Sequence, residues 1–298
     1  MCSWAVLLTA ATATSAFPLT MSTSTTYGFV GVGTMSSAIV RGICTLPAPP
    51  CSAVVLSPRG AEKSAALATE FPALVTVAAD NQEVVDKCDV VFIGVLPKHA
   101  EEVCRTLMFS ERHTVVSLVS TAPMSLLQEV CAPAPASNIV RAIPLPPVAK
   151  HRGATVMTPP NPAITSLFGS LGTVVPVENE ALMKKMMTVS SMMGQFYAQQ
   201  RATQQWLQQQ GVDGDSAAKW TGAVFHCISY DSANANSHTF KELVEEQTPG
   251  GINEQVVREF TEAGVYDALN DSLDGILARV EGRTEPKRNK VKYSSTPE

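Results

Sequence analysis

Short apolar runs alternate with amphipathic segments along the first part of the chain. The apolar runs lie at 27–30, 53–56, 74–77, 90–95 and 114–119, and helical spacing is found at 34–42, 61–70, 81–88 and 100–107. Near-continuous apolar runs are typical of strands that are covered on both faces. Strands that alternate with helices predict a parallel, doubly wound α/β sheet.

The pattern changes after the apolar run 172–177, which we expect to be the last strand. One long helical pattern follows at 178–210, interrupted only by Gly194, and shorter ones lie at 216–232, 239–246, 252–263 and 265–280. Methionines recur at helical spacing in the long pattern, which indicates core or interface packing rather than a cofactor site. They are Met183, Met186, Met187, Met192 and Met193.

These patterns divide the chain into four parts. We predict a targeting or disordered extension over 1–25, a nucleotide-binding domain over 26–178, an all-α domain over 179–282 and a disordered tail over 283–298. A length of 298 residues leaves room for two domains that each bury a core.

Composition excludes several classes of protein. A hydrophobic share of 45% excludes a disordered chain, and a net charge of −5 argues against a nucleic-acid partner. No apolar run reaches the roughly 18–20 residues that span a bilayer, so we expect no membrane segment. The 7 cysteines form no CxxC pair and the 5 histidines form no metal-ligand pair, so we expect reduced thiols and no metal.

The first 17 residues are mostly apolar and small, and no basic residue precedes their apolar run. The stretch Ser15-Ala16-Phe17-Pro18 resembles the cleavage junction of plastid-targeted proteins in algae with secondary plastids. We therefore expect a plastid location. The alternative is an extension ahead of an internal start at Met21, which places the protein in the cytoplasm.

A glycine turn separates the first predicted strand from the first predicted helix. Gly31 and Gly33 allow a sharp turn and a close approach of the backbone to a ligand. The free N–H groups of the following helix, at the positive end of its dipole, suit a pyrophosphate. Ser36 stands where the usual third glycine is found, and Ala38 is placed to make the close helix–strand contact.

The end of the second strand indicates which dinucleotide binds. NAD-selective sites place a carboxylate about 20 residues after the glycines, on the ribose 2′-hydroxyl. Here the strand ends in Leu56-Ser57-Pro58-Arg59, without an acid. The hydroxyl of Ser57 and the guanidinium of Arg59 suit a 2′-phosphate, so we predict NADP. The alternative is a surface arginine in an ordinary turn.

Four segments between Tyr27 and Gly282 match the motifs of one enzyme family. They are 28–38, matching GFxGxGxMxxA; 80–97, matching DN…DvvflaVKPQ; 248–251, matching SPGG; and the closing helices at 262–269. The chain resembles the pyrroline-5-carboxylate reductases.

The resemblance implies a fold, an activity and a set of cofactor contacts. It implies a Rossmann domain followed by an all-α dimerisation domain, and hence a homodimer. It implies NADPH-dependent reduction of the C=N bond of a cyclic imino acid, pyrroline-5-carboxylate to proline, in proline biosynthesis. The cofactor contacts that it implies are Gly31, Gly33, Thr34, Met35, Asn81, Val95, Leu96, Pro97 and Lys98.

The segment Thr248-Pro249-Gly250-Gly251 precedes the predicted helix at 252–263. The residues alone leave two interpretations open: a seat for a substrate carboxylate on free N–H groups, or a loop that caps a helix. The resemblance favours the carboxylate seat and adds Ser190 as a substrate contact. The family threonine that relays a proton falls on Asn253. Because an amide is a poor acid, Thr248 or solvent has to supply the proton.

Departures from the family motifs leave alternatives open. The family's MPNTP segment is Ile143-Pro144-Leu145-Pro146-Pro147 here, which allows another cyclic imine as substrate. The loss of the threonine at Asn253 allows a protein that binds NADP without catalysis. A β-hydroxyacid dehydrogenase is disfavoured, because Lys184 and Lys185 lack an asparagine four residues on.

Overall fold

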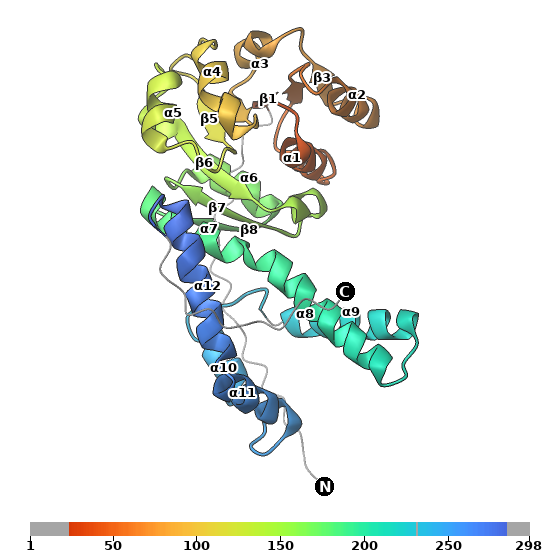
Figure 1. Ribbon diagram of the computed structural model, residues 1–298. Helices are drawn as coiled ribbons and strands as arrows, with labels where there is room; N and C mark the ends of the chain where they lie inside the picture. The colour runs from red at the N-terminus through yellow and green to blue at the C-terminus, as the bar shows by residue number, and fades with distance from the viewer. Residues whose placement is uncertain (1–23, 231, 285–298) are drawn as a thin grey trace, which may run out of the picture. The chain divides into compact units, whose positions relative to one another are not determined.

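The chain divides into two units, and the division falls between Glu180 and Ala181. The computed structural model describes residues 24–230 and 232–284 (Figure 1). The first unit is a β-sheet covered by helices, and the described part of the second is helical, which confirms the predicted fold class. The targeting segment, the start at Met21 and residues 285–298 of the tail lie outside the described residues and stay predictions.

The first unit, here called the sheet domain, has eight described strands in the order β3-β2-β1-β4-β5-β6-β7-β8. The strands are β1 (Thr26–Val30), β2 (Ala53–Leu56), β3 (Val75–Val77), β4 (Val90–Ile93), β5 (Thr114–Ser117), β6 (Ile139–Pro144), β7 (Gly153–Thr158) and β8 (Gly172–Pro176).

Among the described strands, one neighbouring pair departs from the predicted parallel arrangement. β6 and β7 are antiparallel, with Ala142 opposite Met157, and the other neighbouring strands are parallel. The link between them is residues 145–152, mostly a short 3₁₀ turn at Pro146–Lys150. A parallel connection needs a dozen or more residues, so this link is too short for one. The apolar pattern of the sequence predicted neither β6 nor β7.

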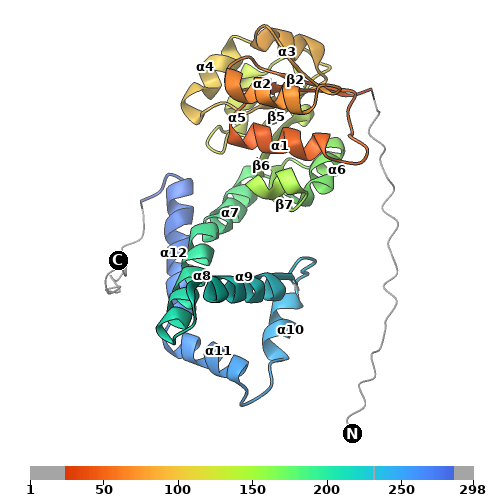
Figure 2. The ribbon, with the colours of Figure 1, turned by 90° about the vertical axis from the view of Figure 1, so that its right-hand side faces the viewer.

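Helices cover both faces of the sheet (Figures 1 and 2). They are α1 (Thr34–Cys44), α2 (Ala61–Glu70), α3 (Asn81–Lys87), α4 (Ala100–Arg105), α5 (Met124–Val130) and α6 (Pro162–Ser170). On one face Phe29 stacks on Phe92, with ring centroids 4.5 Å apart, in a core shared with α1, α2 and α6. On the other face Val91 and Ile93 pack in a core shared with α3, α4 and α5. Successive residues of one strand thus enter opposite cores, which explains the unbroken apolar runs.

The second unit, here called the helical domain, contains most of α7 (Glu180–Ser190), followed by α8 (Met192–Gln209), α9 (Gly214–Tyr230), α10 (Thr239–Glu245), α11 (Ile252–Glu262) and α12 (Val265–Val280). α8 packs on α9, and Phe196 meets Phe225 edge to face at 5.7 Å (Figure 2). No helix among the described residues is long and apolar enough to cross a membrane.

The prediction of one long helix over 178–210 is wrong. The structure has two helices, α7 and α8, with Ser191 between them. The hydroxyl of Ser190 donates to Met187 O at 2.6 Å, and that of Ser191 donates to Thr188 O at 2.7 Å. Adjacent serines that bond back to the helix carbonyls compete with the regular backbone ladder, which accounts for the break.

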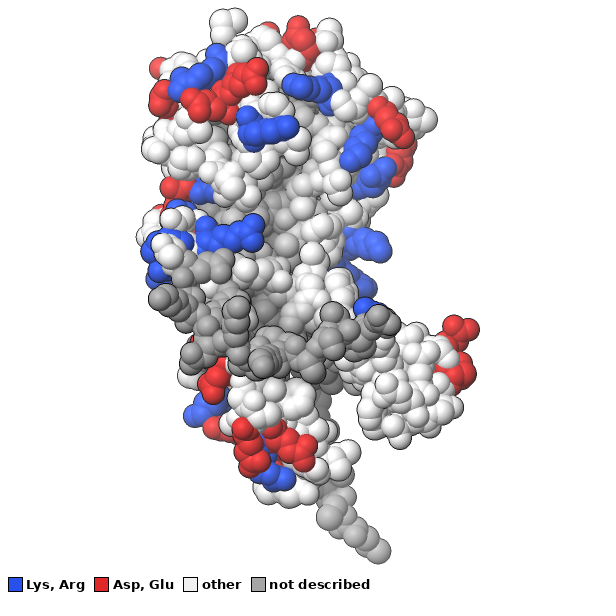
Figure 3. Space-filling model, in the orientation of Figure 1, with Lys and Arg blue, Asp and Glu red and all other residues white. Residues whose placement is uncertain are grey.

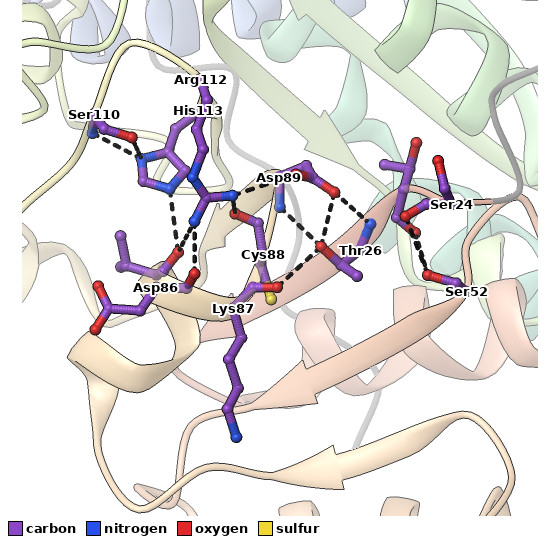
Figure 4. A network of polar contacts seen from close by, with 12 residues as sticks. Ser24, Thr26, Ser52, Asp86, Lys87, Cys88, Asp89, Ser110, Arg112 and His113 are labelled. Carbon is purple, nitrogen blue, oxygen red and sulfur yellow. Dashed lines mark hydrogen bonds and ion pairs between the residues drawn. The ribbon is translucent and has the colours of Figure 1, made fainter.

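A polar network holds the strands together at the edge of the sheet where they begin (Figure 4). Asp89 Oδ2 accepts hydrogen bonds from Thr26 N and Thr26 Oγ1 at 2.9 and 2.8 Å, which joins the starts of β1 and β4. Arg112 donates to Asp86 O at 2.6 Å and to Cys88 O at 2.9 Å, and so caps the end of α3. Burial raises the pKa of Asp89, but the hydrogen bonds from Thr26 and the charge of Arg112 outweigh it and lower the pKa.

His113 belongs to the same network and is buried. Its Nδ1 accepts from Ser110 N at 2.8 Å, so its Nε2 carries the proton and donates to Val85 O at 3.1 Å. Burial, and next the charge of Arg112, lower the pKa of His113, while Val85 O, Asp89 and Asp86 raise it by less. The folded protein therefore keeps this imidazole neutral.

His113→Gln is predicted to flatten the acid side of the stability profile. Above the ordinary histidine pKa of 6.5, folded and unfolded chains are equally deprotonated and no stability is lost. As the pH falls below that value, His113 binds a proton in the unfolded chain but not in the folded chain. The free energy of unfolding therefore falls until the pH passes the lowered pKa of the folded state. Urea unfolding at pH 8.0, 6.5 and 5.5 measures the decline, which should be smaller in the variant. The exposed His238, changed to Gln, is the control, and an equal decline in wild type and His113→Gln contradicts this role.

Candidate cofactor and substrate sites

The order of the strands predicts where a ligand binds in the sheet domain. The chain runs from β1 outward to β2 and β3, then returns to β4 on the other side of β1. In open α/β sheets, ligands bind at such a reversal, beyond the carboxyl ends of the strands. A cofactor is therefore expected at the loops that follow β1, β2 and β4.

The turn after β1 lies directly against the end of β4. Gly31 has a φ of +89°, and a Cβ on it would meet Val95 Cγ1 at 2.8 Å and the backbone of Gly94 at 3.0 Å. A Cβ on Gly94 would lie 2.1 Å from Ser36 Oγ. The Ser36 hydroxyl donates to Gly31 O at 2.8 Å, so the residue in the usual third glycine position ties the turn to α1.

Gly33 differs from these glycines, because the protein itself does not require a glycine there. Its φ of −85° suits any residue, and the nearest atom to a Cβ would be Gly94 O at 3.9 Å. Gly33 is the N-cap of α1, and no side chain caps this helix end. Thr34 is exposed and Met35 is partly buried in the first turn. The missing side chain leaves room for an anion in front of the first N–H groups of α1.

The structure brings Ser57, Arg59 and Asn81 together at the end of β2. Ser57 is fully buried, and its hydroxyl donates to Asn81 Oδ1 at 2.7 Å and accepts from Arg59 N at 3.2 Å. Ser57 therefore shapes the loop from within, and its expected contact with a phosphate stays a prediction. Arg59 is exposed, and its guanidinium has no partner among the described residues.

Lys63 is a second cation near the end of β2, and it was not among the residues predicted from the sequence. It lies in the first turn of α2, four residues after Arg59, and its Nζ donates to Thr34 Oγ1 at 3.2 Å. The first turn of α2 also contains one acid, Glu62. The available signal in the sequence was a second cation four residues after Arg59, at the start of the predicted helix 61–70. On the sheet domain, basic and acidic side chains are interspersed on the face shown in Figure 3.

The loop after β4 begins beside the glycine turn and continues at the surface. Val95 is the residue whose side chain approaches Gly31. Leu96, 63% exposed, precedes a 3₁₀ turn at Pro97–His99, in which Pro97 and Lys98 are exposed. An exposed leucine at this edge provides an apolar surface that a cofactor ring can cover.

The predicted substrate residues, except Ser190, form one turn of the helical domain. Thr248, Pro249 and Gly250 are exposed, Gly250 has a φ of +72°, and Gly251 N donates to Thr248 O at 2.9 Å. Gly251 is the N-cap of α11, and no side chain caps that helix end.

Two further predicted residues already make hydrogen bonds in this domain. Asn253 Nδ2 donates to Gln247 Oε1 at 3.0 Å, so its amide is held beside the turn. The Ser190 hydroxyl donates to Met187 O within α7 and does not bond to the Thr248 turn. Among the residues that the structure describes, no group of three or more His, Cys, Asp or Glu could hold a metal ion.

Comparisons with known proteins agree with this picture of the two domains. Residues 26–122 match the family model described as NADP oxidoreductase, coenzyme F420-dependent. The pyrroline-5-carboxylate reductase of Glycine max is 30% identical over 172 residues, which cover 53% of this chain and 59% of that protein. The chain is thus similar to the pyrroline-5-carboxylate reductases, at low identity. The matched stretches span less than two thirds of the length of the curated plant relatives.

Two solved structures have the same fold as this chain. A pyrroline-5-carboxylate reductase from Coxiella burnetii has a TM-score of 0.74 at 20% identity, over 87% of this chain and 98% of that one. A pyrroline carboxylate reductase from Plasmodium falciparum, solved with NADP bound, has a TM-score of 0.67 at 14% identity, over 87% and 98% of the two chains. At these identities the likeness concerns the fold.

Gly33→Ala is predicted to separate ligand binding from folding. A Cβ at Gly33 meets no protein atom closer than 3.9 Å, so the free energy of unfolding should change by about 1 kcal/mol or less. The same Cβ enters the space in front of α1, so the Kd for NADPH should rise about tenfold or more. Gly31→Ala is the contrasting variant and should lose at least about 2 kcal/mol, because its φ is +89°. Unchanged NADPH binding in Gly33→Ala, measured by nicotinamide fluorescence, contradicts a pyrophosphate at this turn.

Proposed function

We propose that the protein reduces the C=N bond of a cyclic imino acid with NADPH, and that it converts pyrroline-5-carboxylate to proline. The observation that carries the proposal is that two helices begin after an extended glycine, in a chain similar to these reductases. Gly33 precedes α1 in the sheet domain and Gly251 precedes α11 in the helical domain, each without a side-chain cap. The first suits a pyrophosphate and the second suits a carboxylate.

The residues at the end of β2 fit a cofactor with a 2′-phosphate. Arg59 and Lys63 supply two cations, and the β2 end lacks the carboxylate that would repel a phosphate. The buried hydrogen bond from Ser57 to Asn81 uses the amide oxygen and leaves the amide nitrogen of Asn81 as a donor. We assign the 2′-phosphate to Arg59, Lys63 and Asn81.

The turn before α11 fits the carboxylate of the substrate. Its N–H groups and the dipole of α11 attract an anion, and the acid of the first turn, Glu254, is paired with Arg258 at 3.1 Å. When bound, the reduced nicotinamide supplies a hydride for the imine carbon. The imine nitrogen then needs a proton, and the exposed hydroxyl of Thr248, or water held by it, delivers one. Asn253 positions this turn through Gln247.

The helical domain is completed by a second copy of the chain in our proposal. α8 is an 18-residue helix with no buried residue, and α11 also buries none. On α11, Ile252, Val256 and Phe260 follow one another at four-residue spacing and are 81%, 50% and 38% exposed. Such a stripe is the apolar face of an amphipathic helix that lacks a partner. A symmetric dimer buries equivalent stripes from both copies.

The proposed activity is tested with purified protein, NADPH and three imines. We expect oxidation of NADPH with pyrroline-5-carboxylate, slower oxidation with a six-membered cyclic imino acid, and none with 1-pyrroline, which lacks a carboxylate. Turnover of only the six-membered substrate changes the assigned substrate. NADPH binding without any turnover contradicts the reductase and favours a protein that only binds the cofactor.

The cofactor assignment is tested in the same assay with the double variant Arg59→Ala, Lys63→Ala. Loss of two charged contacts to a 2′-phosphate should raise the KM for NADPH about tenfold or more and leave the KM for NADH unchanged. Arg41→Ala is the matched control, because Arg41 is paired with Glu70 at 3.0 Å near the end of α1. Equal effects on both cofactors contradict a 2′-phosphate site.

Val256→Lys is predicted to dissociate the dimer. A charge in the middle of the α11 stripe cannot be buried between two copies without a large desolvation cost. Light scattering after gel filtration should give a dimer for wild type and a monomer for the variant. Gln255→Lys, on the neighbouring residue outside the stripe, should remain dimeric. A monomeric wild type, or a dimer that survives Val256→Lys, contradicts the interface on α11.

A further inference from the structure

One buried cation of the sheet domain has no part in the sites described above. Arg141 lies in the middle of β6 and is 2% exposed. It is one of the largest fully buried side chains of the described residues. Taking a guanidinium out of water costs several kcal/mol unless it is paired and hydrogen-bonded. An apolar side chain would fill this place in the core at lower cost, so the contacts of Arg141 need an explanation.

Arg141 and Glu180 hold one loop at two points. Arg141 Nη2 donates to Ser120 O at 2.7 Å, and Nη1 donates to the carboxylate of Glu180. The same Glu180 Oε1 accepts from Met124 N, the first residue of α5, at 2.8 Å. Residues 118–123, the loop between β5 and α5, are thus tied at Ser120 and at their far end through one ion pair.

This loop lies next to the glycine turn along the carboxyl edge of the sheet. Leu118 N donates to Ile93 O, the last residue of β4, at 3.0 Å, and the following Gly94 lies against Gly31. The 2′-phosphate end of the proposed cofactor is at β2 and its pyrophosphate is at the turn after β1. A dinucleotide that continues in the same direction across β4 brings its nicotinamide to the β5 loop.

We propose that Arg141 is a positioning residue for hydride transfer, and that its ion pair with Glu180 keeps the 118–123 loop in the shape that seats the nicotinamide. This inference rests on the proposed function. Arg141 does not touch the reacting atoms in this account. It acts through Ser120 and Glu180, whose partners set the path of the loop, and small displacements at a reacting ring cost large factors in rate.

The test uses Arg141→Lys, Arg141→Gln and Glu180→Gln in the full-length protein. Lysine keeps the charge but lacks the planar guanidinium that binds two partners at once. Arg141→Lys should therefore retain part of the kcat and of the protection from exchange that Arg141→Gln loses. Glu180→Gln keeps an acceptor oxygen and the volume of the side chain. It is therefore the variant that remains informative if Arg141→Gln does not fold.

Three measurements separate positioning from general damage. Hydrogen exchange of peptides covering 118–124 should be about tenfold faster in Arg141→Gln than in wild type. The kcat with NADPH and the imine should fall about tenfold or more. The Kd for 2′,5′-ADP, which has the phosphate end of the cofactor and no nicotinamide, should stay within about twofold, whereas the Kd for NADPH rises.

Arg112→Ala is the matched control, since Arg112 binds carbonyls at the opposite edge of the sheet (Figure 4). It should lower the melting temperature without changing kcat or exchange at 118–124. The proposal is overturned if Arg141→Gln leaves exchange at 118–124 unchanged, or if 2′,5′-ADP and NADPH lose affinity equally. Exchange and the ratio of the two affinities need no turnover. An inactive wild type would thus contradict the proposed function, whereas exchange and the two affinities would still decide this inference.

Discussion

The close approach of the turn after β1 to the end of β4 is the constraint on which the cofactor end of this protein depends. Side chains at Gly31 and Gly94 would collide with the neighbouring backbone or with Ser36, so both positions need glycine for the protein's own packing. The approach also sets the start of α1, since the Ser36 hydroxyl bonds to Gly31 O. The helix end that results has no side-chain cap, and its free N–H groups suit an anion.

The two edges of the sheet use arginine in different ways. At the edge where the strands begin, Arg112 binds carbonyls at the end of α3 and is paired with Asp89, with side chains 46% and 48% exposed. At the carboxyl edge Arg141 is almost fully buried and ties a loop through Glu180. An exposed pair adds modestly to stability, whereas a buried pair is costly to break because the remaining charge is stranded. Arg141 is buried and its partner Glu180 is partly exposed, and this pair lies at the edge to which function is assigned.

The helical domain has a different relation between sequence and burial. Its helices follow from apolar spacing, yet α8 and α11 bury no residue within the described chain. Helices of such length are stabilised mainly by tertiary packing of an apolar face and not by propensity. In our proposal a second copy of the chain supplies that packing. The turn before α11, with Thr248 and Gly251, then lies at the end of a helix that the dimer stabilises.

The sequence by itself determined the alternation of strands and helices, the glycine turn and the family resemblance, because these depend on local spacing and on residues such as Gly31. It also located α12 at Val265–Val280 as the structure has it. Tertiary structure decided what depends on partners distant in the chain. The burial of Ser57 against Asn81, the tether of Lys63 to Thr34 and the antiparallel β6–β7 pair are examples. The tie from Arg141 to Glu180 spans 39 residues, and local spacing carries no signal of such a contact.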